Sequence, residues 1–385
     1  MAETRKLRMG MVGGGPGAFI GPVHRMAAEL DGRIELVAGA FSSSAEKSRM
    51  AGASYRIDPE RAYGSYEEMF AKEKQRADGI DFVVIATPNS THLPIAKAAL
   101  EAGVPVVSDK PATATYDEVL ELERAVKMAG LPYALTHTYA GYALVRDARA
   151  ICASGELGAI RKVAVEYLQG WLSAPLERTG QKQAAWRADP ALNGPGGCIG
   201  DIGTHAFHLA EYVTGMDVTA LHGTLRSVVA GRKVDDDCTA LLKMSNGAGV
   251  EAEGVLMASQ IAAGEGNGLR IRVYGEAASL HWAQETPNTL TVRRNSGPDE
   301  TRHAGMAYLS ADAVRVTRLP GGHPEGYLEA FAVLYREFAD WLEAWRADGA
   351  DAPPETLPGI RAGVRGMRFV ERAMESNRTG KWVEF

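Results

Sequence analysis

The sequence predicts an α/β protein with an N-terminal Rossmann dinucleotide-binding domain and a C-terminal α+β domain with a large open, mostly antiparallel sheet. Up to about residue 136, short apolar runs without alternation separate helical patterns. Such runs are typical of parallel strands that are buried on both faces. After Gly158, long strand-like runs follow one another with few helices between them. That pattern is typical of antiparallel sheets packed on helices.

Composition restricts the classes of function. The chain has 385 residues, which is enough for two domains with separate cores. Its net charge of −6, without any run of basic residues, disfavours a nucleic-acid partner. The three cysteines lie far apart without C-x-x-C spacing, which favours reduced thiols. No apolar stretch has the length of a secretory or membrane segment. We therefore expect a cytoplasmic protein with no membrane partner.

Residues 7–12 predict the first strand, and the glycine-rich segment 13–21 follows it, before a helix at about 22–31. This arrangement forms a pyrophosphate site, because free backbone N–H groups and the helix dipole point at the anion. The spacing Gly13-x-Gly15-x-x-Ala18 fits the dinucleotide fingerprint, but Gly21 also resembles its closing end. These four residues are the expected cofactor contacts of the loop.

The second strand, 34–41, ends at a run of serines that begins with Ser42 and Ser43. A strict NAD site usually has Asp or Glu here to bind the adenine ribose hydroxyls. The serines lack that carboxylate, and Lys47 and Arg49 follow closely. We expect NAD as the cofactor, with NADP also accepted.

Two further buried strands deliver polar residues at their carboxyl ends, where doubly wound sheets bind ligands. The strand beginning at residue 81 is followed by Thr87, Asn89 and His92, and the strand 104–107 is followed by Lys110. We expect all four residues to contact the cofactor. Helices are expected at 94–101 and, behind the capping box Thr115-x-x-Glu118, up to residue 130. The strand 131–135 completes the first domain, 1–136.

The second domain is expected to span 137–385 and to serve substrate binding and oligomerisation. Its predicted strands are 160–168, 218–229, 238–244, 248–257, 269–274 and 289–294. Helices are expected at about 327–345 and 358–376, and the second of these should pack back on the first domain.

Between these strands, the segment 196–215 combines a glycine-rich start with helical spacing, and Gly215 ends it. On this helix, Asp201, His205, His208 and Tyr212 would share one face. An adjoining stripe should face the core; it consists of Ile202, Ala206, Leu209 and Val213. A carboxylate and two imidazoles beside a packed wall make this helix a candidate active-site element.

With these pieces placed, the chain resembles the Gfo/Idh/MocA family of NAD(P)-dependent sugar and inositol oxidoreductases. Four motifs in the family's order carry the resemblance: Gly21-x-x-His24, Thr87-Pro88-Asn89-x-x-His92, Asp109-Lys110-Pro111 and the Gly-Asp-Ile-Gly-Thr-His segment 200–205. In the third motif, Asp109 stands where the family's Glu-Lys-Pro has glutamate, so the acidic character is kept. The match to the family spans nearly the whole chain.

The resemblance implies an active site between a Rossmann domain and a C-terminal sheet domain. It also implies that Lys110 hydrogen-bonds the reacting hydroxyl, that His205 is the general acid/base, and that Asp201 orients or charges His205. The chemistry agrees, because oxidation of a secondary alcohol needs a base, and histidine titrates near neutral pH. Relatives form dimers and tetramers, so we expect a homotetramer or a dimer.

Lys110, Asp201 and His205 are also expected to contact the substrate, together with Arg187 and His323. Arg187 lies just upstream of the glycine-rich segment, and an interdomain or surface ion pair is its equally plausible role. Because these expected substrate contacts are all polar, we predict a substrate with many hydroxyl groups. The predicted reaction is oxidation of a secondary hydroxyl on a cyclic polyol, either an inositol or a pyranose with equivalent hydroxyls. Within the same family, the alternatives are an aldose 1-dehydrogenase and a glycoside 3-dehydrogenase.

Two interpretations from other functional classes compete with this one. Asp201, His205 and His208 have a helical spacing that could ligate zinc, but a zinc enzyme leaves the glycine loop and Lys110 unexplained, so no metal is expected. A non-catalytic dinucleotide sensor would keep the fold without the chemistry. The joint presence of Lys110, Asp201 and His205 disfavours it.

Overall fold

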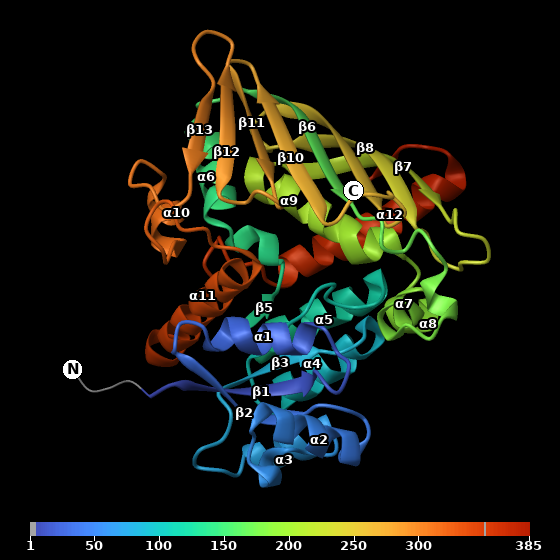
Figure 1. Ribbon diagram of the computed structural model, residues 1–385, viewed down its shortest axis with the longest axis vertical. Coiled ribbons are helices and arrows are strands. Elements are labelled where there is room, and N and C mark those ends of the chain that lie inside the picture. Colours follow the sequence, from blue (N-terminus) through green and yellow to red (C-terminus); the bar gives the residue numbers. More distant parts are fainter. Residues whose placement is uncertain (1–4, 350–351) are drawn as a thin grey trace. The chain divides into compact units, whose positions relative to one another are not determined.

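The computed structural model describes residues 5–349 and 352–385 (Figure 1). Its contacts divide the chain into two compact units. Unit 1 comprises Met1–His137 and Phe331–Val364, and unit 2 comprises Thr138–Ala330 and Arg365–Phe385. A parallel Rossmann sheet forms unit 1 and a mostly antiparallel sheet forms unit 2, so the predicted fold class is confirmed.

In the described part of unit 1, five parallel strands form a sheet in the order β2-β1-β3-β4-β5. The strands are β1 (Leu7–Gly13), β2 (Ile34–Ala40), β3 (Phe82–Ala86), β4 (Val106–Ser108) and β5 (Tyr133–Leu135). The strand order reverses between β1 and β3, which is the switch point where doubly wound sheets bind ligands. Every residue of β3 is buried, as its unalternating apolar run predicts.

Helices and short helical turns connect the strands of this sheet. They are α1 (Ile20–Glu29), α2 (Ala45–Tyr55), η1 (Pro59–Arg61), α3 (Tyr66–Glu73), η2 (Asn89–Thr91), α4 (His92–Glu101) and α5 (Tyr116–Ala129). The expected capping box of Thr115 and Glu118 is present at α5. The sequence reading had not predicted α2 and α3, although Ser44 and Ser65 accept the N-cap hydrogen bonds of these helices.

The second domain was predicted as one continuous piece, 137–385, and the structure differs. Residues from Phe331 onward in α11 (Tyr327–Asp348) belong to unit 1, because their rings pack there. The Phe338 ring lies 5.1 Å from that of Phe82 on β3, and the Phe331 ring lies 4.8 Å from that of His24 on α1. The C-terminal helix α12 (Ile360–Thr379) begins in unit 1 and continues in unit 2.

Unit 2 is built on a large sheet in which nine strands of the described chain take part, in the order β13-β12-β11-β10-β6-β9-β8-β7-β14. Their bounds are β6 (Ile160–Leu168), β7 (Asp217–Arg226), β8 (Asp237–Ser245), β9 (Glu251–Ser259), β10 (Gly268–Gly275), β11 (Ala278–Ala283), β12 (Thr289–Arg294), β13 (Glu300–His303) and β14 (Val383–Glu384). Only the pair β6–β9 among these described strands is parallel. The sequence reading missed β11, β13 and β14.

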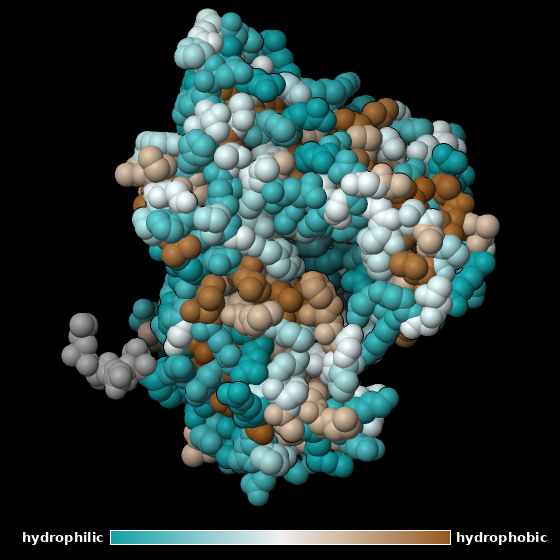
Figure 2. All heavy atoms as spheres, viewed as in Figure 1, coloured by the Kyte–Doolittle hydropathy of each residue, from teal (hydrophilic) through white to brown (hydrophobic). Residues whose placement is uncertain are grey.

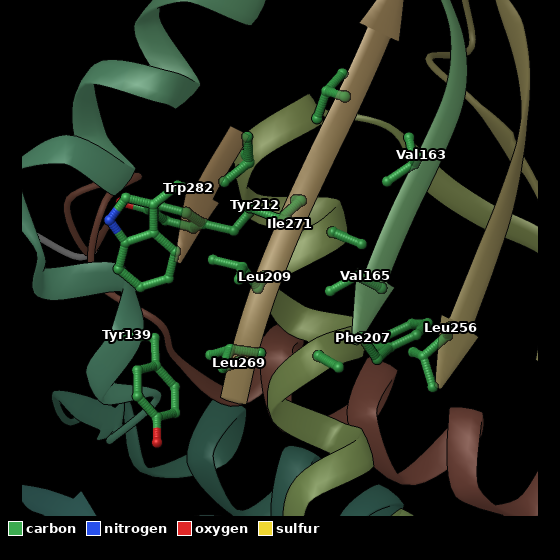
Figure 3. Close-up of a cluster of buried hydrophobic side chains, with 14 of the residues drawn as sticks. Tyr139, Val163, Val165, Phe207, Leu209, Tyr212, Leu256, Leu269, Ile271 and Trp282 are labelled. Atoms are coloured by element: carbon green, nitrogen blue, oxygen red, sulfur yellow. The ribbon is translucent and has the colours of Figure 1, made fainter. Parts of the chain in front are cut away.

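Helices of unit 2 cover one face of this sheet. These are α6 (Ala143–Ser154) and α9 (Thr204–Thr214). Unit 2 also contains the shorter segments η3 (Thr138–Gly141), η4 (Leu176–Arg178), α7 (Lys182–Arg187), α8 (Pro190–Asn193), η5 (Ile199–Gly203) and α10 (Ala311–Val316). Figure 3 shows Val165 of β6 and Ile271 of β10 on the side of the sheet that carries Phe207 and Leu209 of α9. All four side chains are at most 2% exposed, so this layer is the core of unit 2.

The face seen in Figure 2 is largely hydrophilic, with hydrophobic areas interrupted by polar side chains. Within residues 5–349 and 352–385, none of the helices combines the length and apolar character needed to cross a lipid bilayer. Cys152, Cys198 and Cys238, which all lie in the described chain, are free thiols.

Candidate active site

The glycine loop after β1 is shaped by close backbone approaches. Gly13 has φ +96°, and a Cβ atom there would lie 2.3 Å from the carbonyl oxygen of Ala86 at the end of β3. A Cβ at Gly15 would lie 2.5 Å from the carbonyl oxygen of Phe41, directly after β2. Side chains at these positions would push the loop away from the ends of both strands.

Gly21 takes the part of the third fingerprint glycine. A Cβ there would lie 2.3 Å from the Cα atom of Gly14, so this glycine lets α1 pack against the loop. Ala18 instead donates its backbone N–H to the carbonyl oxygen of Gly15 in a turn. The loop is therefore longer than the usual fingerprint. Glycines between β1 and the N-terminus of α1 are what a dinucleotide pyrophosphate requires, so these residues fit the group.

The serines after β2 form a local turn. Ser42 Oγ accepts the backbone N–H of Ser44 over 3.2 Å, and Ser44 Oγ accepts the N–H of Lys47 as the N-cap of α2. Ser43 is exposed, as are Lys47 and Arg49. Hydroxyls and cations, without a carboxylate, therefore follow the end of β2, as the sequence indicates.

The end of β3 is tied to the lysine loop by His92. Both ring nitrogens of this buried imidazole face backbone carbonyl oxygens: Nδ1 lies 2.8 Å from Pro111 and Nε2 lies 2.9 Å from Thr87. The Thr87 hydroxyl also accepts a hydrogen bond from Thr91. Burial lowers the pKa of His92. Its cofactor contact stays a prediction, and the structure gives His92 a bracing role between two loops.

Lys110 lies directly after β4, at the carboxyl edge of the sheet, as the strand pattern predicts. Its backbone N–H donates to Asp109 Oδ1 over 2.9 Å, and the Thr136 hydroxyl donates to the same oxygen over 3.0 Å. Burial alone would raise the pKa of Asp109. The neighbouring His24, together with the charges of Lys110 and His92, nevertheless lowers it to about 2. An ionised carboxylate therefore supports the lysine loop.

In unit 2, the candidate helix begins with a π-helical turn, η5, and continues as α9. Such turns are rare and concentrate at functional sites. Asp201 in this turn is 9% exposed, and Asp201 Oδ2 accepts two hydrogen bonds, from Arg187 Nε over 3.0 Å and from Gln260 Nε2 over 2.9 Å. The sequence analysis had missed Gln260, which follows β9 as an isolated amide without a motif.

His205 lies one turn further along α9 and is 8% exposed. Its ring packs against two tyrosines, with centroid distances of 4.8 Å to Tyr139 and 6.0 Å to Tyr167. The two hydroxyls lie 2.5 Å apart, and Tyr167 also donates to Asn267 Oδ1. Burial raises the pKa of both tyrosines, which keeps their hydroxyls protonated.

A carboxylate that the sequence analysis had not singled out anchors the start of this segment. Asp235 Oδ1 accepts the backbone N–H of Gly197 over 2.6 Å, and Asp235 Oδ2 accepts that of Ile199 over 2.7 Å. The backbone carbonyl of Asp235 accepts the N–H of Cys198. A Cβ at Gly197 would lie 2.2 Å from that carbonyl oxygen, which explains a glycine there.

Other predicted residues lie apart from this cluster. His208 is on α9 but stacks on Tyr212, with ring centroids 5.5 Å apart, and burial lowers its pKa to about 3. His323 is exposed in a turn, where Nδ1 lies 3.2 Å from the carbonyl oxygen of Pro320. In the described parts of the chain, no group of three or more His, Cys, Asp or Glu side chains could hold a metal ion.

The predicted site residues therefore form two groups, one in each unit. The glycine loop, Thr87, His92 and Lys110 follow the ends of β1, β3 and β4 in unit 1. Arg187, Asp201 and His205 belong to unit 2, where hydrogen bonds and ring contacts join them to Gln260, Tyr139 and Tyr167.

Family comparisons match both units. Residues 7–137 match a family model described as an oxidoreductase family with an NAD-binding Rossmann fold. Residues 145–281 match the GFO/IDH/MocA C-terminal domain. The uncharacterized oxidoreductase YfiI of Bacillus subtilis (strain 168) is 36% identical over 390 residues, which cover 99% of this chain and 98% of that protein.

Two further proteins are similar. The levoglucosan dehydrogenase of Pseudarthrobacter phenanthrenivorans is 25% identical over 337 residues, 79% of this chain and 80% of that protein. An inositol dehydrogenase homologue from Azotobacter vinelandii in complex with NAD⁺ has a TM-score of 0.94 at 39% identity, covering 100% of this chain and 98% of that one. A structure described as the homologue from the same organism with NADH and myo-inositol has a TM-score of 0.91 at 38% identity, covering 99% and 98%.

Proposed function

Because the chain belongs to the Gfo/Idh/MocA family of oxidoreductases and carries that family's NAD-binding Rossmann domain, we propose that it oxidises one secondary hydroxyl of a cyclic polyol to a ketone. The substrate would be an inositol, or a pyranose presenting equivalent equatorial hydroxyls. NAD⁺, held by the loop that contains Gly13, Gly15 and Gly21, supplies the hydride acceptor when bound.

Three residues would handle the hydroxyl group. Lys110 would hydrogen-bond the reacting oxygen and hold it at the carboxyl edge of the Rossmann sheet. His205 would take the hydroxyl proton at Nε2 or Nδ1, since an imidazole can exchange a proton near neutral pH. Asp201, ionised and held by two donors, would orient His205 and favour its protonated form.

The observation that carries this proposal is the concentration of polar groups around Asp201 and His205. Besides the Asp201 hydrogen bonds, a chain of polar groups runs from Tyr139 and Tyr167 to Asn267 and then to Gln169. An apolar alcohol could use none of the donor and acceptor capacity that these groups keep beyond those bonds, and each buried polar group left unsatisfied costs about 1–3 kcal/mol. A ring with many hydroxyls would satisfy them.

A neutral substrate is favoured over a sugar acid. Arg187 is the arginine nearest this cluster in sequence, and its Nε donates to Asp201 while its Nη1 donates to Gln183. A bidentate carboxylate clamp requires a guanidinium edge that faces the ligand. With Nε and Nη1 directed at protein groups, Arg187 supports the charge of Asp201.

An aldose 1-dehydrogenase or a glycoside 3-dehydrogenase is the second candidate, because the same residues could act on a pyranose. Oxidation at the anomeric carbon would give a lactone, whereas oxidation of an inositol gives a ketone. The inositol reading is favoured by the Azotobacter homologues, whose identities of 38% and 39% exceed the 25% of the levoglucosan dehydrogenase. A non-catalytic dinucleotide sensor is the remote alternative.

A substrate screen tests the function. Purified protein is mixed with NAD⁺ or NADP⁺ and with inositols, aldoses, glycosides and 2-propanol, and absorbance of the reduced nicotinamide is followed. We expect turnover of an inositol and a loss of orders of magnitude in kcat/KM for its deoxy analogues. Equal turnover of 2-propanol would contradict the polyol proposal, and no turnover of any compound would favour the sensor.

The same assay tests cofactor choice. Serine hydroxyls can still bind ribose, so we propose NAD⁺ as the preferred cofactor, with measurable use of NADP⁺. Lys47 and Arg49 are exposed cations near the expected 2′-position and could attract a phosphate. A kcat/KM ratio above about a thousand in favour of NADP⁺, roughly 4 kcal/mol, would contradict this preference.

The sheet of unit 2 supports a proposal about assembly. Its inner face is covered by helices, whereas Leu241 on β8 is 49% exposed and Ala164 and Val255 on neighbouring strands are partly exposed. Such apolar positions on an uncovered face favour a partner surface. We propose that a second copy covers this face in a dimer or homotetramer, and that the protein acts in the cytoplasm.

A further inference from the structure

We propose that His24 positions Lys110 through Asp109, and that this contact couples the helix at the cofactor loop to the lysine that orients the substrate. The proposal rests on the function proposed above for Lys110. His24 belongs to the motif Gly21-x-x-His24, and no step of the proposed oxidation uses it. It is therefore a positioning residue in this scheme.

The first observation is the burial of His24. Its side chain is 0% exposed, on the buried face of α1, three residues after Gly21. Nδ1 lies 2.6 Å from the Tyr335 hydroxyl, and the ring packs edge-on against Phe331. A polar ring enclosed in this way needs partners for both of its nitrogens.

The second observation is the direction of the other nitrogen. Nε2 lies 3.8 Å from Asp109 Oδ1, which is an ion-pair distance. When the Tyr335 hydroxyl donates to Nδ1, the ring proton is on Nε2 and faces the carboxylate. When the ring is protonated, both nitrogens donate. Either state directs an N–H at Asp109, whereas the remaining tautomer would point a lone pair at the carboxylate.

The third observation is that Asp109 acts directly on the lysine loop. One oxygen, Oδ1, receives the backbone N–H of Lys110 and the Thr136 hydroxyl, and it is also the oxygen nearest to His24 Nε2. His92 also lowers the pKa of the same carboxyl. The Lys110 backbone is thus fastened to an anion whose position depends on α1.

Through these contacts, α1 supports both the glycine loop and the lysine loop. Its first turn carries Gly21, which packs on the glycine loop, and its second turn carries His24, which supports Asp109. A displacement of α1 would therefore be transmitted to Lys110 through the contact between His24 and Asp109. Misplacement of a catalytic group by about 1 Å can cost about a hundredfold in rate, so such a support matters for turnover.

A double-mutant cycle tests the coupling. The variants are His24→Leu, Lys110→Ala and the double variant, assayed with the best substrate of the polyol screen. We expect His24→Leu to lower kcat about tenfold or more in the wild-type background, with little change in the Kd for NAD⁺. In the Lys110→Ala background the same substitution should cost nothing further, because its effect passes through Lys110.

Conservative variants separate positioning from folding. His24→Gln keeps a donor toward Asp109 and should recover part of the activity that His24→Leu loses. Tyr335→Phe removes the group that sets the His24 tautomer and should lower kcat in the same direction. The matched control is Tyr63→Phe, which removes another buried tyrosine hydrogen bond in unit 1, to Glu73, and should leave kcat unchanged.

A second readout does not depend on turnover. Trace acetylation at one alkaline pH measures the reactivity of Lys110 relative to that of exposed Lys74. Without His24, Asp109 Oδ1 loses a group that faces it and the Lys110 loop loses part of its support, so His24→Leu should change the labelling rate of Lys110 relative to that of Lys74. The Tyr63→Phe control should keep the wild-type ratio.

Two results would overturn the inference: equal kcat losses from His24→Leu with and without Lys110, or an unchanged labelling ratio. If no polyol is oxidised by the wild type, the proposed function fails. The labelling ratio then decides the positioning role of His24 by itself.

Discussion

Arg187 Nε donates a hydrogen bond to Asp201 Oδ2 over 3.0 Å, and its guanidinium lies 4.3 Å from the ring centroid of Trp186. The arginine is thus held between an aromatic face and the carboxylate beside His205. A planar, always charged guanidinium stabilises the ionised form of Asp201 and fixes its orientation. Arg187 therefore belongs to the machinery that keeps this carboxylate charged.

The first prediction concerns this pair. Arg187→Met should lower kcat about tenfold to a hundredfold, because Asp201 Oδ2 loses its charged donor. The kcat of Arg187→Lys should lie between those of the wild type and Arg187→Met, because an ammonium cannot reproduce the Nε hydrogen bond and the ring contact together. Steady-state kinetics check this, with Arg161→Met, at an exposed ion pair with Glu276, as control. Equal activity of all four proteins would contradict the assignment.

The second prediction concerns the proposed acid/base group. Lys110→Ala and His205→Ala should each lose at least about a hundredfold in kcat, as loss of an acid/base partner typically does. Asp201→Asn should be milder if Asp201 only orients His205. Wild-type activity should rise with pH through a histidine-like ionisation, because the base must be unprotonated. Near-normal turnover by His205→Ala would move the proton path to Lys110.

The third prediction concerns the glycine loop. A Cβ atom at Gly15 would lie 2.5 Å from the Phe41 carbonyl oxygen. Gly15→Ala should therefore lower both the Tm and the affinity for NAD⁺. Gly32→Ala, where a Cβ would meet open space, should lower only the Tm. Unchanged NAD⁺ affinity in Gly15→Ala would argue against this loop as the cofactor cradle.

The fourth prediction concerns pH and stability at Asp235. Burial raises its pKa to about 6, although two backbone N–H groups favour the charged form. The folded state therefore holds this proton more tightly than the unfolded state. The stability it contributes is complete below about pH 4 and is lost as pH rises through about 6, by about 3 kcal/mol.

Asp235→Asn does not titrate, so its stability deficit relative to wild type should be largest in acid and should narrow by about that amount at neutral pH. Urea unfolding at several pH values measures the difference. A deficit that stays constant between about pH 4 and pH 7 would show that the Asp235 carboxyl has an ordinary pKa.

The fifth prediction concerns the uncovered sheet face. Leu241→Glu places a charge at an exposed apolar position of β8 and should shift the protein toward smaller species in sedimentation or light scattering. Thr219→Glu, at an exposed position of β7, is the matched control and should alter the assembly less. A wild-type monomer at micromolar concentration would contradict the proposed oligomer.

Several elements could be read from local pattern. The unalternating run of β3, the glycines after β1 and the Thr115 capping box each depend on residues within a few positions of one another. β11 also carried a readable signal, because Ala278, Leu280 and Trp282 alternate with more exposed residues, and all three are buried.

Other features had no local signal. Asp235 is 36 residues from Ile199, to which it is hydrogen-bonded, and Gln260 is 59 residues from Asp201. Neither Asp235 nor Gln260 lies in a sequence motif that predicts its hydrogen bonds. The placement of α11 with the Rossmann sheet likewise depends on Phe338 meeting Phe82 across 256 residues. Sequence periodicity shows that a face is apolar, and it cannot show which surface covers that face.

The sequence alone determined the fold class, the family and the residue types available for chemistry, since backbone preference, hydrophobic period and motif order are local properties of the chain. Only the tertiary structure decided how those residues are supported. It showed that Gly21 packs on Gly14, that Arg187 holds Asp201, and that His24 faces Asp109. Each of these contacts arises from segments that meet only once a sheet and its helices have packed, because burial of apolar faces selects the partners of the polar groups carried with them.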